Sequence, residues 1–292
     1  MSPLFLTIRR CSGRAADGFT LVELVTVMVL MGILSASFMM FFKPTIDGYF
    51  AARRRADLTD IADTALRRMH QDLKKAVPNS VFITDPTTLS DGVACFQFVP
   101  TIGGGRYRLS GDSTNDDTTC PTSGNCSKYP DDSLAATASQ TFDVLLWGGV
   151  EPAKNQTIVI NNQNGDDVYD GSSRAEITSA TKPSPKEEFG THRLEIGRNP
   201  IGNYADGNFL LVATTEPVVM YSCSGGKLYR KNLGDFTKAA ACAADGDLLA
   251  TDLQSCEFLD VGKAGYLWMT LAVSRNNETV RLAYGAHVDN QP

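Results

Sequence analysis

A single carboxylate interrupts the most apolar stretch of this chain. From Phe19 to Phe42 there are 24 consecutive residues in which Glu23 is the only ionisable side chain. A helix of that length, at about 1.5 Å per residue, spans a bilayer core of about 30 Å. Placing an acid in such a helix costs on the order of 2.5 to 3.5 kcal/mol, so we expect Glu23 to have a function.

The residues before this apolar run are compatible with several kinds of leader. A secretory signal peptide carries its small-residue cleavage site after the apolar region, whereas the best candidate here, Gly18, precedes it. A lipoprotein would use Cys11, but that residue follows two arginines rather than an apolar lead-in. A plain signal anchor explains everything except Glu23 and the junction between Gly18 and Phe19.

Gly18, Phe19 and Glu23 resemble the processing site of type IV prepilins and type II secretion pseudopilins. The resemblance implies cleavage by a prepilin peptidase after Gly18, N-methylation of Phe19, and retention of the helix as membrane anchor and filament core. Glu23 would then serve assembly by balancing the N-terminal ammonium of a neighbouring subunit. It also implies an inner-membrane, single-pass subunit whose head lies in the periplasm and later on a pilus at the cell surface. The implied partners are the prepilin peptidase, other minor and major pilins packed through the N-terminal helix, and the inner-membrane assembly platform.

Length and charge limit the remaining possibilities. Removing residues 1–18 leaves 274 of 292 residues, enough for the membrane helix and one substantial head. The leader holds three Arg and one Asp, so the formal net charge moves from -6 to -8. An acidic chain lacks the concentrated basic surface that nonspecific nucleic-acid binding requires, and we expect no general binding of nucleic acid.

Six cysteines remain once Cys11 leaves with the leader, and an even number outside the cytoplasm suggests disulfides. Six cysteines allow fifteen pairings, so an assignment depends on loop length and neighbours. Cys120 and Cys126 close a short turn-rich loop, and Cys242 and Cys256 close another across a turn. These two choices leave Cys95 for Cys223.

No catalytic constellation can be assembled from this sequence. Gly-x-Ser-x-Gly, His-Glu-x-x-His and a phosphate loop are all missing, and Gly103-Gly104-Gly105 lacks the Lys-Ser/Thr of a phosphate cradle, so we interpret it as a turn. We therefore expect no enzyme activity. We also expect no cofactor and no metal centre, because the three histidines, His70, His192 and His287, lie far apart and no Cys-x-x-Cys is present. The acidic segments Asp112–Asp117 and Asp166–Asp170 could bind calcium, although solvated loops are the simpler interpretation.

The elements that would carry these residues follow from hydrophobic periodicity. Seven residues after Pro44 recur at helical spacing and predict an amphipathic helix bounded by Pro78: Leu58, Ile61, Ala62, Ala65, Leu66, Met69 and Leu73. Pro44 should kink or interrupt the preceding helix. Strand-like alternation then predicts a mainly antiparallel β head, with segments at 93–99, 142–147, 157–160, 192–196, 209–213 and 218–223 and hairpins at 218–230 and 266–288.

The chain is therefore expected to have an α+β, pilin-like fold. Its parts would be a leader at 1–18, a membrane and filament-core helix at 19–43, an amphipathic helix at 44–77 and a β-rich head at 78–292. The passage from Arg67 to Val81 resembles large minor pilins, and so do the strings Glu216-Pro217, Tyr221-Ser222-Cys223 and Leu228-Tyr229-Arg230. The ending from His287 to Pro292 most resembles the MshO-type minor pilin of mannose-sensitive haemagglutinin (MSHA) pilus systems. That resemblance implies a minor pilin that takes part in pilus initiation and assembly within a tip complex. PilW-like minor pilins, the J-type minor pseudopilin of type II secretion, and a tip adhesin or DNA-uptake subunit are the alternatives.

Overall fold

The structure is a computed structural model of the chain, and it divides into two compact units, Met1–Arg53 and Arg54–Pro292. Each unit is described by itself. The residues whose placement is described are 18, 20–85, 92–108, 140–182, 190–200, 207–260 and 266–288.

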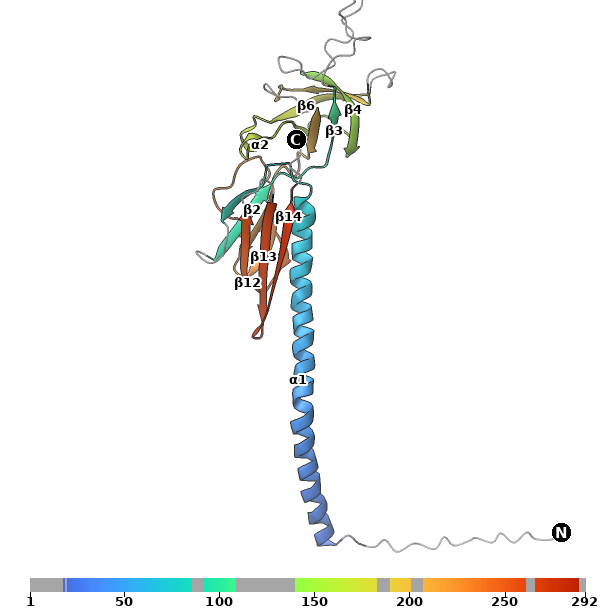
Figure 1. The fold of residues 1–292 in the computed structure, drawn as a ribbon, viewed down its shortest axis with the longest axis vertical. Helices are drawn as coiled ribbons and strands as arrows, with labels where there is room; N and C mark the ends of the chain where they lie inside the picture. The colour runs from blue at the N-terminus through green and yellow to red at the C-terminus, as the bar shows by residue number, and fades with distance from the viewer. Residues whose placement is uncertain are drawn as a thin grey trace, which may run out of the picture. The chain divides into compact units, whose positions relative to one another are not determined.

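The longest element is helix α1, Leu21–Leu73, which continues through Pro44 without a break (Figure 1). The missing amide of one proline is therefore insufficient to end the helix, and the predicted interruption is wrong. The helix stops four residues before the predicted boundary at Val77, where two backbone bonds from Lys75 to Asp72 and from Ala76 to Leu73, both 3.0 Å, tighten the last turn.

The predicted amphipathic stripe is confirmed in the second unit. Six of the seven residues are buried and Ile61 is half-buried against them.

The buried side of the helix packs on two antiparallel sheets, which share one core with it. The first sheet has the order β1-β2-β9-β10-β11, with bounds Phe82–Asp85, Val93–Phe98, Val219–Ser224, Lys227–Asn232 and Asp247–Ala250. The second has the order β12-β13-β14, with bounds Leu253–Asp260, Tyr266–Arg275 and Glu278–His287.

Both predicted hairpins are present. β9 and β10 join through Gly225 and Gly226, and β13 and β14 join through Asn276 and Asn277, whose φ angles of 51° and 63° suit a two-residue turn of type I′. Together with the packed half of α1, the two sheets form the region that we call the helix–sheet core. The fold is thus the pilin-like α+β arrangement that the sequence predicts.

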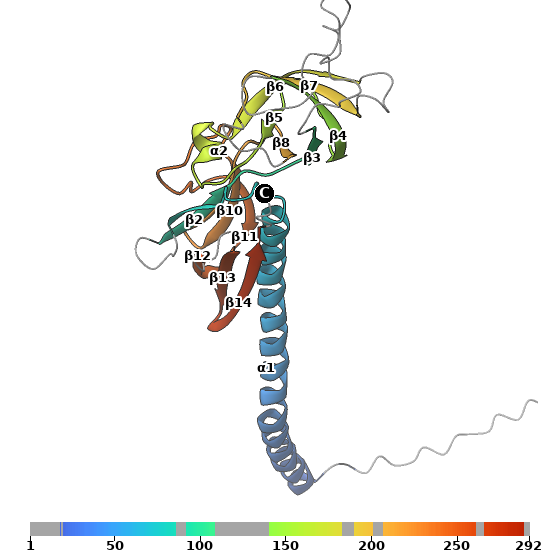
Figure 2. The ribbon, with the colours of Figure 1, turned by 45° about the horizontal axis from the view of Figure 1, so that its top comes forward.

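Six further strands close into an antiparallel barrel in the order β3-β4-β7-β6-β5-β8 (Figure 2). In chain order, the strands are β3 (Gly103–Tyr107), β4 (Thr141–Gly149), β5 (Thr157–Val159), β6 (Arg174–Thr181), β7 (His192–Ile196) and β8 (Asn208–Val212). A short helix, α2 (Asp167–Asp170), lies between β5 and β6 in the sequence. The barrel has its own buried centre, where Tyr107, Phe142 and Phe209 meet aliphatic side chains from the other strands. The sequence predicts no strand segment where β6 lies, and it does not predict a closed barrel.

The barrel is an insertion between two neighbouring strands of the core. β2 ends at Phe98 and β9 begins at Val219, and these two residues are hydrogen-bonded strand partners. All six barrel strands lie between them in the sequence. The chain therefore leaves the core sheet, builds a closed barrel and returns to the adjacent position.

Gly103, Gly104 and Gly105 form most of β3, so the predicted turn is wrong. A Cβ added at Gly103 would lie 2.7 Å from the carbonyl oxygen of Gly148, and one at Gly104 would lie 2.7 Å from that of Phe209. The two flanking strands therefore approach β3 too closely for any side chain, which explains a glycine run inside a strand.

A third cluster of buried side chains joins the barrel to the core. Val77, Val99 and Val218 from the core side pack with Val159 of β5 and Val168 of α2. Next to this cluster, the hydroxyl of Tyr169 donates a 2.6 Å hydrogen bond to the carbonyl of Ser80. Asn162 likewise donates to the carbonyl of Pro78 at 2.6 Å. The insertion is thus fastened to the segment that follows α1.

Candidate functional site

The candidate assembly site lies at the start of α1. Glu23 is in the first turn, and its backbone amide donates to the hydroxyl of Thr20 at 3.3 Å, as at a helix N-cap. The carbonyl of Glu23 accepts a 2.9 Å hydrogen bond from the hydroxyl of Thr26. Gly18 is exposed and a Cβ there would meet nothing within 4 Å, while Phe19 lies outside the described residues.

The side chains that follow Glu23 belong to no buried core of the described chain, and their ring contacts, such as that of Phe38 with Phe42, lie within the helix itself. From Leu21 to Phe50 every described side chain is exposed, including Met40 at 84%. By length and composition this part of α1 could cross a membrane, with a mean hydropathy of 2.3 over its most apolar window. A largely apolar, exposed run of 19 residues without an ionisable side chain, Leu24–Phe42, requires lipid or another helix around it.

The far end of α1 carries a partly buried ion network. Asp72 accepts hydrogen bonds from the hydroxyl of Tyr221 at 2.7 Å and from Nε of Arg230 at 3.0 Å, and Arg68 approaches it at 3.7 Å. Arg230 also donates to Glu216 at 2.6 Å. Burial raises the pKa of Tyr221, and although burial acts against the charge of Arg230, its bonds to Glu216 and Asp72 raise the pKa of that guanidinium above its usual value. Both side chains therefore keep their charge states throughout the physiological range.

This network connects three parts of the sequence. Asp72 belongs to α1, Tyr221 and Arg230 belong to the β9–β10 hairpin, and Glu216 ends the connection that returns from the barrel. The sequence gives these four residues only as parts of strings that resemble minor pilins, and it does not predict that they contact one another. The alternation of side chains along β9 could have predicted part of this contact, because Tyr221 faces α1 while its neighbours Met220 and Ser222 face away.

The disulfides differ from two of the predicted pairs. The structure joins Cys95 to Cys242 and Cys223 to Cys256, with Cα–Cα distances of 5.6 and 6.3 Å. The predicted pairs Cys95–Cys223 and Cys242–Cys256 are therefore wrong. The predicted pair Cys120–Cys126 lies outside the described residues.

The strand register explains why Cys95 cannot reach Cys223. Cys95 lies opposite Ser222, and Cys223 lies opposite Ala94, so the two cysteines are one position out of step on adjacent strands. Residues that are out of step by one point to opposite faces of a sheet. Cys223 consequently faces α1 and meets Cys256 of β12, whereas Cys95 faces the other side.

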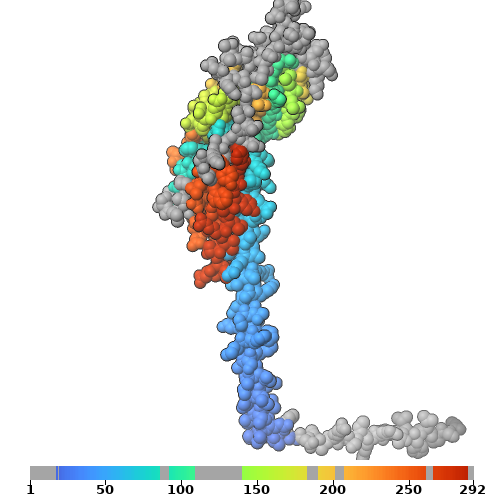
Figure 3. Space-filling view, viewed as in Figure 1, coloured from blue at the N-terminus to red at the C-terminus, as the bar shows by residue number. Residues whose placement is uncertain are grey.

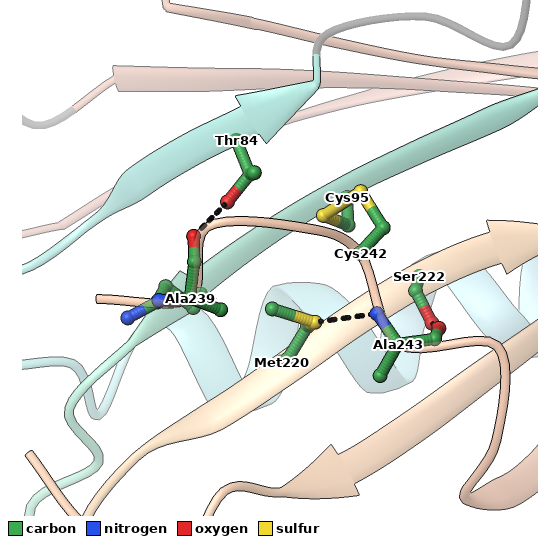
Figure 4. Close-up of a disulfide and its surroundings, with 8 residues drawn as sticks. Thr84, Cys95, Met220, Ser222, Ala239, Cys242 and Ala243 are labelled. Atoms are coloured by element: carbon green, nitrogen blue, oxygen red, sulfur yellow. Dashed lines mark hydrogen bonds between the residues drawn. A yellow bond between two sulfur atoms is a disulfide. The ribbon is translucent and has the colours of Figure 1, made fainter. Parts of the chain in front are cut away.

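On that other side, Cys242 fastens a strap made of residues 233–246 over the sheet (Figure 4). The buried side chain of Gln97 donates to the carbonyl of Thr237 at 3.2 Å and accepts from the amide of Ala239 at 2.9 Å. Ser222 donates to the carbonyl of Ala243. The strap thus provides hydrogen-bond partners for Gln97 and Ser222 and covers this face of the sheet, so the face is buried.

The acidic segment Asp166–Asp170 forms α2 and its N-terminal flank, and its carboxylates are used within the chain. Asp166 pairs with Lys238, Asp167 accepts a 2.9 Å bond from the amide of Asn164, and Asp170 accepts one of 2.7 Å from the amide of Ser172. These bonds favour a structural role over calcium binding. The other acidic segment, Asp112–Asp117, lies outside the described residues.

The three histidines belong to different elements: His70 to α1, His192 to β7 and His287 to β14. Nε2 of His192 lies 3.1 Å from Glu151, which also pairs with Lys182 at 2.5 Å, and these two contacts lower the pKa of Glu151. Within the described part of the chain, no three His, Cys, Asp or Glu side chains come together as a metal centre would require.

Comparison with known proteins gives one match. Residues 13–39 match the model of the prokaryotic N-terminal methylation motif, which is typical of type IV prepilins and pseudopilins. No curated protein and no solved structure matches the chain.

The matched residues cover the junction at Gly18, the whole first turn of α1 with Glu23, and most of the exposed apolar part of the helix. The chain therefore carries the signature of a prepilin-peptidase substrate of the type IV pilin and pseudopilin class. Proteins of this class are structural subunits rather than enzymes, and their apolar helix anchors them in the inner membrane before they assemble through it.

Proposed function

We propose that this chain is a minor pilin of the MshO type that helps to initiate a type IV pilus of the MSHA-like kind as part of a tip complex. A prepilin peptidase would cut after Gly18 and methylate Phe19. The subunit would then wait in the inner membrane, with its head in the periplasm, until the assembly platform inserts it into the filament. Other minor and major pilins would pack along its N-terminal helix.

One observation carries the proposal. The methylation motif at 13–39 runs without interruption into α1, and the outer half of the same helix is built into the core of a β-rich head. A disposable leader has no reason to continue into the core of the mature protein. The motif and the fold therefore favour a subunit that keeps its apolar helix and uses it for assembly.

The inserted barrel supports placement at a tip. Six additional strands enlarge the head well beyond the helix–sheet core. In a closely stacked shaft, each copy would have to bury or displace the polar connections of such a head, and a buried unpaired polar group costs on the order of 1 to 3 kcal/mol. At a tip the head meets neighbours on one side only. The J-type minor pseudopilin shares the N-terminal features, and co-purifying partners separate the two possibilities.

The test compares Glu23→Leu with Thr26→Leu, a matched removal of a polar side chain one turn along the same helix. Removing a charge makes membrane insertion easier, so Glu23→Leu should reach the membrane at normal levels, carry N-methyl-Phe19 by mass spectrometry, and fall at least about tenfold in sheared filaments. Thr26→Leu should be incorporated normally. Normal incorporation of Glu23→Leu would contradict the charge-pairing role, and an uncut leader in cells with active peptidase would contradict the class of protein.

A second measurement addresses place in the filament. Immunogold labelling of the wild-type head should mark filament ends, and deletion of the chain should reduce the number of filaments without changing the diameter of those that remain. Uniform labelling along the shaft would contradict the tip placement.

A further inference from the structure

The helix–sheet core has four strands at the edges of its two sheets, and they differ in how well they are protected against pairing with another chain. β1 and β11 are each four residues long, and the ladder beside each of them contains a register shift. β12 also has a register shift, and it passes close to β1 and β2 of the other sheet. Short length, irregular register and cover are the usual ways in which an edge strand is protected.

β14 lacks these protections. It is ten residues long, contains no proline, and pairs with β13 at all ten positions without a shift. Its other edge has no strand partner among the described residues. Figure 3 shows the strands β13 and β14 in red at the surface, beside the packed half of α1 in light blue to cyan. β14 is therefore the one long and regular edge that the described part of the core leaves open.

The hairpin turn decides which backbone groups of β14 face this open edge. Arg275 and Glu278 close a two-residue turn, so they form a hydrogen-bonded pair, and every second pair after them does so as well. The residues between these pairs direct their backbone groups away from β13: Thr279, Arg281, Ala283 and Gly285. In the described structure no backbone hydrogen bond reaches these groups from another element. The edge therefore offers N–H and C=O groups at the spacing that an added strand requires.

α1 contacts β14 through the inner face of the strand. Glu278 and Tyr284 belong to that face, and they bond to Arg55 at 2.7 Å and to Asp63, respectively. Three of the four residues that point the other way are fully exposed, and Gly285 is half-exposed. The open edge is thus accessible to another chain.

Three arginines border this edge, and their charged ends face solvent. Arg55 and Arg67 come from α1 and Arg281 belongs to β14, and each side chain is about two-thirds exposed. The acids with which they pair are only 19% to 35% exposed: Glu278, Asp63 and Glu257. These bonds use one nitrogen of each guanidinium, so further N–H donors remain for carboxylates that arrive from outside.

We propose that the open edge of β14 binds an extended, acidic segment of another protein, which joins the three-stranded sheet as a fourth strand. The backbone groups of β14 supply affinity for an extended chain, and the bordering arginines select carboxylate side chains. A second copy of β14 fits this edge poorly, because it would bring a second set of the same three arginines against the first.

The test removes one backbone donor from the open edge without touching the ladder to β13. Ala283→Pro does this, because the amide of Ala283 points away from β13. Ala283→Val is the matched control, because it keeps the amide and suits a strand. The full chain, solubilised in detergent, is used to select binders from a random library of dodecapeptides displayed on phage. Formation of the Cys95–Cys242 and Cys223–Cys256 disulfides on non-reducing gels shows that each variant has folded.

We expect the selected peptides to be acidic, to bind wild type and Ala283→Val alike, and to bind Ala283→Pro at least about tenfold more weakly. Selection of no acidic peptide, or equal binding to the two Ala283 variants, would overturn the proposal.

Hydrogen exchange resolved to single residues gives a second measurement on the wild-type chain, which does not depend on the folding of any variant. The bound peptide should slow exchange at the amides of Thr279, Arg281 and Ala283, and it should leave the amides between them unchanged because these already bond to β13. Uniform protection of β14, or none, would contradict strand addition. Neither measurement depends on whether the chain is found in a pilus, so failure of this proposal is distinct from failure of the proposed function.

Discussion

The helix–sheet core and the inserted barrel achieve stability in different ways. The core is built from open sheets and a helix, and both described disulfides lie in it, one on each face of the five-stranded sheet. The barrel closes on itself, so it has no edge strands that need covering. An open layered structure gains from covalent links between layers, whereas a closed barrel obtains the same constraint from its own hydrogen-bond ladder.

The two regions also differ in which functional features they carry. The residues proposed for processing and for charge pairing in assembly belong to the N-terminal part of the chain: the methylation motif at 13–39 and Glu23 within it. The barrel contributes none of these and enters the core through a single pair of adjacent strands. It is therefore the part of the head that can change without altering the helix.

The largest expected effect concerns the two disulfides. Cys95–Cys242 spans 147 residues and encloses the whole barrel, while Cys223–Cys256 spans 33. If a disulfide stabilises by restricting the unfolded chain, removing the first by double alanine substitution should cost about 5 kcal/mol and removing the second about 4. Urea unfolding of the detergent-solubilised chain measures both losses.

A barrel deletion sharpens that comparison. Replacing residues 100–217 by Asn-Gly would join β2 directly to β9 as a hairpin and shorten the longer disulfide loop to nearly the length of the shorter one. The core should still form both disulfides, and their removal should now cost nearly the same. Loss of both disulfides after deletion would show that the core depends on the barrel to fold.

A smaller effect is expected from a single methyl group in the barrel. Gly104→Ala would force Cβ against the carbonyl of Phe209, and overpacking of this kind costs typically about 1 to 3 kcal/mol. Gly148→Ala is the matched control, because a Cβ there meets nothing within 4 Å. Limited proteolysis should cleave the barrel of Gly104→Ala faster than that of Gly148→Ala, while the core disulfides remain intact in both variants. Equal sensitivity of the two variants would contradict the close approach of β3 to its neighbours.

The smallest effect is a pH dependence in the core. A hydrogen bond from Arg55 lowers the pKa of Glu278 below its ordinary value of 4.5, and bonds from Tyr284 and Arg67 lower that of Asp63. Acids with lowered folded-state pKa values stabilise the fold above their ordinary pKa and lose that contribution as the pH falls through the lowered value. Glu278→Gln should therefore reduce stability slightly at pH 7 and make the acid transition below about pH 4.5 less steep.

Much of the fold follows from the sequence because it depends on local periodicity. The stripe from Leu58 to Leu73 and the two hairpins follow from spacing alone, because helical and strand periodicity can be recognised within a segment of about ten to twenty residues. The pairing of the cysteines could not be predicted from spacing, because it depends on the face of the sheet to which each strand residue points. Knowledge that Cys95 lies opposite Ser222 requires the register of two strands that are far apart in the chain.

The barrel escaped prediction for a related reason. β3 is mostly glycine, so it has no side chains to alternate. β6 alternates only briefly, with Ala175 and Ile177 buried, inside an otherwise polar segment. Both are strands because their neighbours supply the backbone partners, and tertiary context overrides weak local preference. The candidate assembly residues were easier to find, because a lone acid in an apolar run stands out without any knowledge of the fold.

The insertion point has a consequence for the order in which the exported chain matures. Phe98 and Val219 are strand partners, yet about 120 residues separate them, and contacts between such distant segments form late. Under the proposed function the head is exported with its N-terminal side leading, so the packed half of α1, β1 and β2 would emerge first, and then all six barrel strands. The barrel has every strand that it needs before β9 appears, so it can close while the apolar stripe of α1 is still uncovered. During that interval the subunit is half folded and exposes the surface that its own C-terminal strands will later cover, which makes the speed of export a determinant of its yield.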